Sequence, residues 1–511
     1  MPCPRSIVFG LPFALLLLGA PAAAASELKT GGTLRVAGLN EISHVDPAVA
    51  DNPVALQVQY ATALKLFNYV GGPRIKGTRL VPEAVSSYSV SRDGTVYTFT
   101  IRSGFRFATG ERVTAKHFRH AIRRALDPRI GSSARFMISG LSRVRVTGAR
   151  TTGNRLILTL AEPSSRLLGV LATPFFQAVP LSAGVPGRAP SQADVLPSAG
   201  PYSIATYEPR KRLVLVRNRF YGGRRPQRLD AIEFSFGIAP EQTVPLVEAG
   251  HADYTTYLLP AVHGELARKY GVNGGRFRVS ASECVEYLTF NPASPLFQDN
   301  PALRRAVGYA LDRRQLATAY GTFHSRPHDQ FFPPSVPGFR DLKLFPLGGP
   351  DLATANRLAS GHKRHAHATM MHGAIGPSPW HLAVQRALAS IGITLDLRMS
   401  FGLLIATGDL YWDGWCSRED LGDRVDGLET WAYYAKEPRF EQKARAAQRL
   451  RGAARRAAAD RLERELTKDR ALIVPWGIRN VHELFSARVE PGSIRFQPIY
   501  GAVDLAALAL K

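Results

Sequence analysis

The chain has 511 residues, too many for one small hydrophobic core, so two or three domains are expected. Its 65 Lys and Arg outnumber its 41 Asp and Glu, which gives a formal net charge of +24 at pH 7. The basic residues are spread along the whole chain, and no stretch alternates basic with aromatic residues. This distribution argues against a nucleic-acid partner. A generally basic surface is the preferred interpretation, and anionic peptides or an acidic cell envelope remain open as partners.

The first 26 residues have the pattern of a secretory signal. Arg5 supplies a positive start, residues 7–19 are apolar, and Ala23–Ala25 form a small-residue cleavage site. The apolar stretch is shorter than the roughly 20 residues that a membrane-spanning helix needs, so a cleaved signal is expected rather than an anchor. Cys3 precedes the apolar stretch, which argues against a lipoprotein anchor. We therefore expect the mature chain to be exported, to a periplasmic or extracellular location.

Strand and helix patterns alternate along the first half of the mature chain. The turn Asp93-Gly94 sits between two stretches of alternating side chains and predicts a hairpin that ends at Ile101. Thr114 is suited to cap a helix that begins at Ala115. A second hairpin is expected over 144–160, around Gly153-Asn154. Further strands are expected over 33–37, 197–204, 213–221 and 229–236, with helices over 56–67 and 241–250.

The second half continues this alternation, which argues for α/β lobes. Helical segments are expected within 297–316 and over 351–360, 379–391 and 440–468, with strands over 285–291, 366–371 and 392–397. Residues 326–350 form a Pro-rich passage. Residues 488–510 are too polar and too often broken by Gly for a helix.

No catalytic motif stands out in the sequence. There is no nucleophile elbow, zinc-protease helix, phosphate-binding loop or dinucleotide fingerprint. A binding protein needs none of these, so we favour a non-enzyme, with an exported peptidase as the alternative. The strongest metal pattern is His362, His365, His367 and His372. No Cys or carboxylate completes it at a known spacing, so a solvated strand edge is preferred and neither metal nor cofactor is expected.

The order of the segments resembles the family-five extracellular solute-binding proteins, the peptide- and nickel-binding receptors of ABC importers. Leu80–Asp127 carries a hairpin, an aromatic loop and a capped helix, and resembles the signature region of that family. Gly200-Pro201-Tyr202 and the segment 297–316 resemble other family motifs, and the likeness covers essentially the whole mature chain. The resemblance implies an α/β, two-lobed fold of the periplasmic-binding-protein type II, with an additional subdomain inserted in the first lobe.

The resemblance also implies a division of the chain and a mode of action. The expected parts are a signal peptide (1–26), a first lobe (27–65, 173–281 and 479–511), an inserted subdomain (66–172) and a second lobe (282–478). Ligand would bind between the lobes, and hinge closure would bury it before delivery to a membrane permease and its ATPase. Short peptides are the default ligand, and the receptor is expected to be monomeric. A nickel or metallophore receptor, and a receptor-like regulator without transport, remain alternatives.

Ligand contacts are implied where the family places its cleft walls. Trp415 fits the family's Gly-Trp-x-x-Asp segment, and Trp412 is a plausible second wall. The position that usually holds Asp is Arg418 here, so recognition of a peptide amine is in question and an anionic group is the alternative. The further candidates are Asn40 and Glu41 after the first strand, Tyr287, Ser417, Asp420 and Trp476. Core packing of the tryptophans and a solvated Glu41 are the competing interpretations.

Two cysteines, Cys284 and Cys416, follow the signal segment. In an exported protein such a pair favours one disulfide, with two buried free thiols as the alternative. A bridge between them would tie the Trp415 loop to the sheet of the second lobe.

Overall fold

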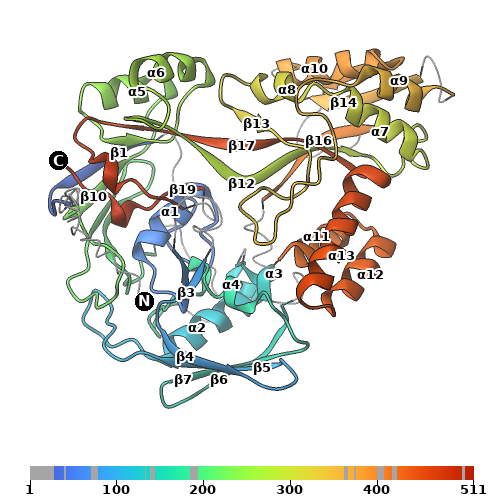
Figure 1. Cartoon of the computed structure of the whole chain (residues 1–511). Coiled ribbons are helices and arrows are strands. Elements are labelled where there is room, and N and C mark those ends of the chain that lie inside the picture. The colour runs from blue at the N-terminus through green and yellow to red at the C-terminus, as the bar shows by residue number, and fades with distance from the viewer. Residues whose placement is uncertain are drawn as a thin grey trace, which may run out of the picture.

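The computed structural model in Figure 1 has two α/β lobes side by side and a third body beneath the first lobe. It describes residues 28–38, 42–70, 79–132, 134–138, 144–184, 194–361, 366–372, 376–399, 408–416, 423–497 and 501–511. Among these residues, no helix combines the length and the apolar character that crossing a bilayer requires.

A nine-stranded sheet runs through both lobes. In spatial order its strands are β16 (Leu410–Cys416), β12 (Phe277–Phe290), β17 (Ile473–Phe485), β11 (Tyr254–Thr255), β1 (Thr33–Ala37), β10 (Ala231–Ser235), β9 (Arg212–Arg217) and β8 (Tyr202–Glu208), and β13 (Ser325–Pro327) also pairs with β17. β12 and β17 are long antiparallel strands that reach from one lobe into the other (Figure 1). They therefore form the connection about which the lobes can hinge, and the predicted two-lobed α/β fold is confirmed.

The first lobe packs helices on both sides of its part of the sheet. α1 (Pro53–Thr62) is capped by Asn52, whose side chain accepts a 2.8 Å hydrogen bond from the amide of Ala55. The helix predicted over 56–67 ends earlier, at Thr62. The reason lies far away in sequence, because Gly200 approaches so closely that a Cβ there would lie 2.4 Å from the Thr62 carbonyl oxygen. The lobe also contains α5 (Pro240–Glu248), α6 (His263–Tyr270), β18 (Phe496–Gln497) and β19 (Ala502–Val503).

The body beneath the first lobe is a four-stranded antiparallel sheet covered by a helix. Both predicted hairpins are confirmed, and Thr114 caps α2 through a reciprocal box with His117. The elements are β4 (Val85–Val90), β5 (Val96–Ile101), β7 (Arg155–Leu160) and β6 (Val146–Thr152), with α2 (Ala115–Leu126), α3 (Arg135–Ile138) and α4 (Leu167–Val170). β2 (Phe67–Tyr69) and β3 (Leu80–Pro82) pair between this body and α1. A continuous apolar core under α2 packs this body together and extends to residues of α1, while the residue boundaries proposed for it remain predictions.

Helices cover both faces of the sheet in the second lobe. One layer contains α7 (Pro301–Ala310), α8 (Arg313–Thr318), α9 (Leu352–Ala359) and α10 (Pro379–Ala389), with the strand pair β14 (Ala366–His372) and β15 (Ile393–Met399). The other contains α11 (Arg424–Tyr434), α12 (Pro438–Gln448) and α13 (Gly452–Arg464). The single helix predicted over 440–468 is wrong, because the chain turns between α12 and α13, where Gly452 takes a positive φ of 53°.

Candidate functional site

β1 and β16 lie on either side of the hinge strands in the shared sheet. β1 lies in the first lobe and β16 at the sheet edge in the second, with β12, β17 and β11 between them. Residues 39–41 follow β1 and residues 417–422 follow β16, and both segments lie outside the described residues. The proposed roles of Asn40, Glu41, Ser417, Arg418 and Asp420 therefore stay predictions.

A disulfide between Cys284 and Cys416 ties the end of β16 to β12. The bond lies where β12 bulges between Ala281 and Val285. Ser282 stabilises the bulge, since its hydroxyl donates to the carbonyl of Arg479 at 2.9 Å and accepts from the amide of Cys284 at 3.1 Å. The disulfide thereby fixes the end of β16 to a hinge strand.

Trp415 and Tyr287 project from one face of the sheet. Both are nearly buried, with 7% and 1% of their surfaces exposed, and their rings lie 5.7 and 6.2 Å from the ring of Phe331. Tyr287 also hydrogen-bonds the carboxylate of Asp413, its partner across the strand pair. Asp413 is a polar residue that the sequence reasoning missed, and it presents a carboxylate on the exposed part of β16.

Trp412 and Trp476 lie on the opposite face, in a cluster of aromatic rings. The Trp412 ring is half-buried and stacks on Tyr320 at 5.6 Å, and it lies 6.3 Å from Trp476. Trp476 is fully buried and packs against Trp380 at 5.9 Å. Trp476 is thus a core residue in this structure, whereas Trp412 keeps part of its ring accessible.

Glu286 forms a buried ionic group near the hinge that the sequence reasoning also missed. Its carboxylate accepts from the Ser325 hydroxyl at 2.5 Å and from Arg479 Nε at 3.1 Å, and His324 Nε2 is 3.9 Å away. Burial by itself would raise the pKa of Glu286. The nearby imidazole of His324, the charge of Arg479 and the hydrogen bond from the Ser325 hydroxyl outweigh burial and lower that pKa. A Glu within the apolar stretch of β12 was the available signal in the sequence.

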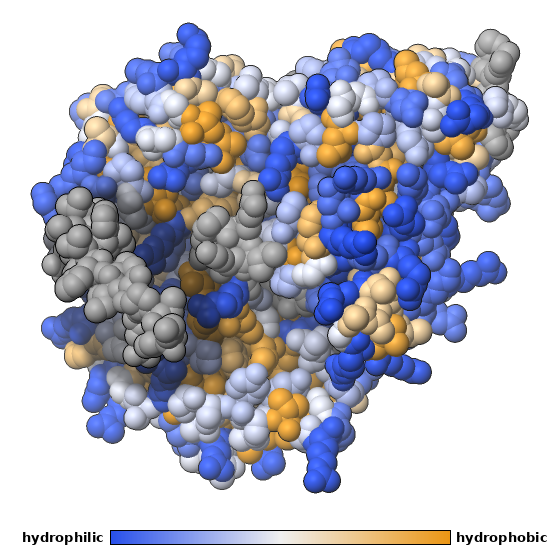
Figure 2. All heavy atoms as spheres, in the orientation of Figure 1, coloured by the Kyte–Doolittle hydropathy of each residue, from blue (hydrophilic) through white to orange (hydrophobic). Residues whose placement is uncertain are grey.

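Direct contacts join the body beneath the first lobe to the second lobe, where α4 lies beside α11 (Figure 1). The Ser165 hydroxyl donates to Asp426 Oδ2 at 2.7 Å, and the Arg166 guanidinium donates to the backbone carbonyl of Asp426. Arg455 and Gln448 hold the other carboxylate oxygen at 3.0 and 3.1 Å. Figure 2 shows that this face of the molecule is hollowed near its middle, and both hydrophobic and hydrophilic residues line the hollow.

The histidines considered as metal ligands do not come together within the described residues. His367 is exposed and lies 3.5 Å from Asp396 Oδ2, whereas His372 is buried with its ring 6.1 Å from His381. His362 and His365 fall outside the described residues. Within the part of the chain that the structure describes, no three His, Cys, Asp or Glu side chains gather in a way that could hold a metal.

Two lobes on a shared sheet, long hinge strands and an extra body against the first lobe define the class of two-lobed periplasmic-binding receptors. Residues 79–418 match the profile described as "Bacterial extracellular solute-binding proteins, family 5 Middle". The chain belongs to this family.

Several known proteins are similar to this chain. The dipeptide-binding protein DppE of Bacillus subtilis is 26% identical over 377 residues, which cover 68% of this chain and 66% of DppE. The match thus spans just under two thirds of that relative's length. Among solved structures, clavulanic acid biosynthesis oligopeptide binding protein 2 is 22% identical with a TM-score of 0.81, over 94% of this chain and 96% of that chain. DppA from Helicobacter pylori in complex with the peptide STSA is 18% identical with a TM-score of 0.73, over 94% and 98% of the two chains.

Proposed function

We propose that this protein is the extracytoplasmic substrate-binding subunit of an ABC importer and captures short peptides between its lobes. The match to the family-five profile over 79–418 carries the proposal. Similar proteins are named for dipeptides and oligopeptides, and one similar structure holds a peptide. On this proposal the protein is exported, acts without catalysis, and passes its ligand to a permease that works with an ATPase.

Binding follows from hinge closure in this proposal. Ligand enters between open lobes, bending at β12 and β17 brings the lobes together, and contacts to both lobes stabilise the closed form. Main-chain groups of the peptide supply hydrogen bonds, while bridging water accommodates different side chains. Ser165 and Arg166, next to the four-stranded body, contact Asp426 of the second lobe directly. This contact supports a closing motion that brings these two parts of the molecule together.

The charge at Arg418 bears on which end or side chain of a peptide is recognised. An arginine repels the amine of a peptide and attracts a carboxylate, so we propose a preference for ligands that present an anionic group near the end of β16. Asp413 remains on β16 as a carboxylate of opposite charge. A ligand with an amine beside Asp413 and a carboxylate beside Arg418 satisfies both groups.

Mass spectrometry of small molecules released from protein purified without refolding tests the function directly. We expect short peptides. If the protein is empty, thermal shifts are measured with a peptide library, sugars, opines and nickel. The variant Arg418→Asp is expected to shift preference from acidic toward basic peptides, because the local charge is reversed. No response to any peptide, or hydrolysis of the library, contradicts the proposal. A response to nickel alone favours the metal-receptor alternative.

A further inference from the structure

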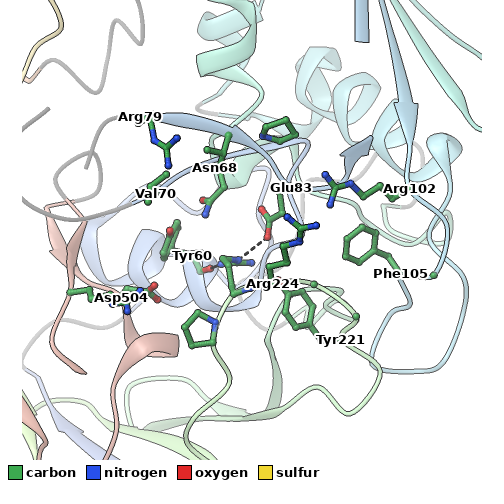
Figure 3. A pocket seen from close by; sticks show the side chains of 18 of the residues that line it. Tyr60, Asn68, Val70, Arg79, Glu83, Arg102, Phe105, Tyr221, Arg224 and Asp504 are labelled. Carbon is green, nitrogen blue, oxygen red and sulfur yellow. Dashed lines mark hydrogen bonds and ion pairs between the residues drawn. The ribbon is translucent and has the colours of Figure 1, made fainter. Parts of the chain in front are cut away.

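A pocket of about 780 Å³ lies away from the hinge strands, at the junction of α1, the β2–β3 pair and the turn that follows β9. Its walls come from segments far apart in sequence. They include Tyr60 of α1, Asn68 of β2, the loop 102–105, the turn 221–226, and Arg495 and Asp504 near the C-terminus. Figure 3 shows Arg79 and Arg102 on opposite sides of the pocket, with Glu83 between them. The volume falls within the range of about 300–1,000 Å³ that small-molecule sites occupy.

Positive charge dominates the lining of this pocket. Two carboxylates, Glu83 and Asp504, face five arginines, an excess of three positive charges. The arginines are Arg79, Arg102, Arg224, Arg225 and Arg495.

At the base of the pocket one of the two carboxylates, that of Glu83, is already paired with Arg225. Arg225 Nε donates to Glu83 Oε1 at 2.7 Å, and the same guanidinium donates to the carbonyls of Tyr60 and Ala63. Lys65 is fully buried behind them, with Nζ 3.8 Å from Glu83 Oε2 and 4.1 Å from the centre of the Tyr60 ring. Two buried cations therefore share the single carboxylate of Glu83. Burial, and to a lesser extent the charge of Arg225, lowers the pKa of Lys65 to about 7.

The rim adds three further arginines, of which Arg102 donates from Nε to the Val85 carbonyl at 3.1 Å. Within the described ranges, no carboxylate forms an ion pair with Arg79, Arg102 or Arg224. These three residues come from the start of β3, the loop after β5 and the turn after β9, so only the fold brings them to one opening. Tyr221 and Phe105 supply aromatic surface beside them. Clustered cations repel one another, and a bound anion relieves that repulsion.

We propose that this pocket binds a small organic anion with at least two negative charges, carried by phosphate or carboxylate groups. Guanidinium groups hold both kinds of oxyanion through paired charge-assisted hydrogen bonds, and the aromatic walls accept an apolar or ring-containing part. The site is separate from the space between the lobes and goes beyond the proposed capture of peptides. It gives the receptor a second ligand, bound where α1 and the neighbouring four-stranded body meet.

A uniformly basic surface is the competing explanation, since the whole chain carries a net charge of +24. That explanation predicts that any two exposed arginines contribute equally to anion binding. The pocket predicts that only the lining arginines matter, because an anion contacts several of them at once.

Calorimetry on the full mature chain tests the site with pyrophosphate, citrate and acetate as probes at one fixed ionic strength. We expect binding of pyrophosphate or citrate with one-to-one stoichiometry, and no measurable binding of acetate. The variant Arg79→Gln/Arg224→Gln should weaken that binding about tenfold for each arginine removed. Arg92→Gln/Arg150→Gln removes the same charge from exposed positions that do not line the pocket, and should leave the affinity unchanged.

Each result of the calorimetry either supports or contradicts the anion site. A preference for pyrophosphate assigns phosphate chemistry, and a preference for citrate assigns carboxylate chemistry. Absence of binding by the wild-type chain, or equal weakening in both double variants, overturns the site. Melting temperatures of the variants establish that they are folded, and Arg224→Gln alone serves if the pocket double variant is not. Peptide binding is measured in the same preparations, so that failure of this site and failure of the proposed function are distinguishable.

Discussion

The hydroxyl of Ser165 donates a 2.7 Å hydrogen bond to the carboxylate Oδ2 of Asp426, and this bond joins the four-stranded body to the second lobe. Asp426 is itself held in place by Arg455, whose Nη2 lies 3.0 Å from the other carboxylate oxygen. Arg166, next to Ser165, adds a hydrogen bond to the Asp426 carbonyl. These bonds connect the four-stranded body to the second lobe, so they depend on the distance between these two parts of the molecule.

Removing the Ser165 hydroxyl should therefore shift the lobes toward an open arrangement. We expect Ser165→Ala to increase the radius of gyration of the ligand-free protein in X-ray scattering. A hydrogen bond to a charged group contributes about 1.5 kcal/mol, so ligand affinity should fall about tenfold if closure is required for binding. Ser86→Ala removes a hydroxyl that bonds within the four-stranded body and should change neither quantity. An unchanged radius and affinity in Ser165→Ala would show that this contact does not influence closure.

Loss of the disulfide should lower the free energy of unfolding. The bond closes a sequence separation of 132 residues, and the chain-entropy account gives up to about 5 kcal/mol for such a loop. Urea unfolding of Cys284→Ser/Cys416→Ser measures the loss. Reductant should destabilise the wild-type protein by the same amount and leave the double variant unaffected. A wild-type curve that does not respond to full reduction rules out this contribution.

The buried Glu286 should make stability fall at acid pH. Its pKa is lowered in the folded state, so the ionised form stabilises the fold above the ordinary value of about 4.5. This contribution is lost as the pH falls through the folded pKa. Melting temperatures between pH 3 and 7 should therefore show the largest gap between wild type and Glu286→Gln near pH 6, with the gap narrowing below about 4.5. Glu162→Gln, at an exposed site, is the control. A gap that stays constant across this range contradicts the prediction.

A pair of stacked histidines beside the hinge should add a second, separate acid sensitivity. The rings of His263 and His482 are 3.8 Å apart, and burial together with His263 lowers the pKa of His482 to about 4. The unfolded chain takes up this proton near pH 6.5, so protonation favours unfolding. Stability from this source is complete above pH 6.5 and declines toward pH 4.

Thermal unfolding of His482→Gln tests this second effect. The variant should melt at a lower temperature at neutral pH, because its hydrogen bond to the Phe323 carbonyl is lost. Its melting temperature should then change less than that of the wild type between pH 6.5 and 4. The exposed His251→Gln should follow the wild type throughout. Parallel curves for wild type and His482→Gln would exclude a role for this pair.

Local chemistry explains which predictions from sequence succeeded. The Asp93-Gly94 turn and the Thr114 cap act through neighbouring backbone groups, and the hairpin and helix start appear where these residues predict them. The early end of α1 could not be predicted in this way. It depends on the approach of Gly200, and nothing in the local pattern marks that contact.

The class of fold, the order of its segments and the two cysteines available for pairing follow from the amino-acid sequence, because they depend on periodicity, turn chemistry and residue count. Which polar groups meet depends on the three-dimensional arrangement of the segments. Glu286 accepts hydrogen bonds from Ser325 and Arg479 on other strands of the sheet. Asp426 accepts one from Ser165, which lies in another part of the molecule. The arginines around Glu83 likewise converge from separate segments. Charge and hydrogen bonding act through space, so residues that are unremarkable along the chain become sites only after the fold has brought them together.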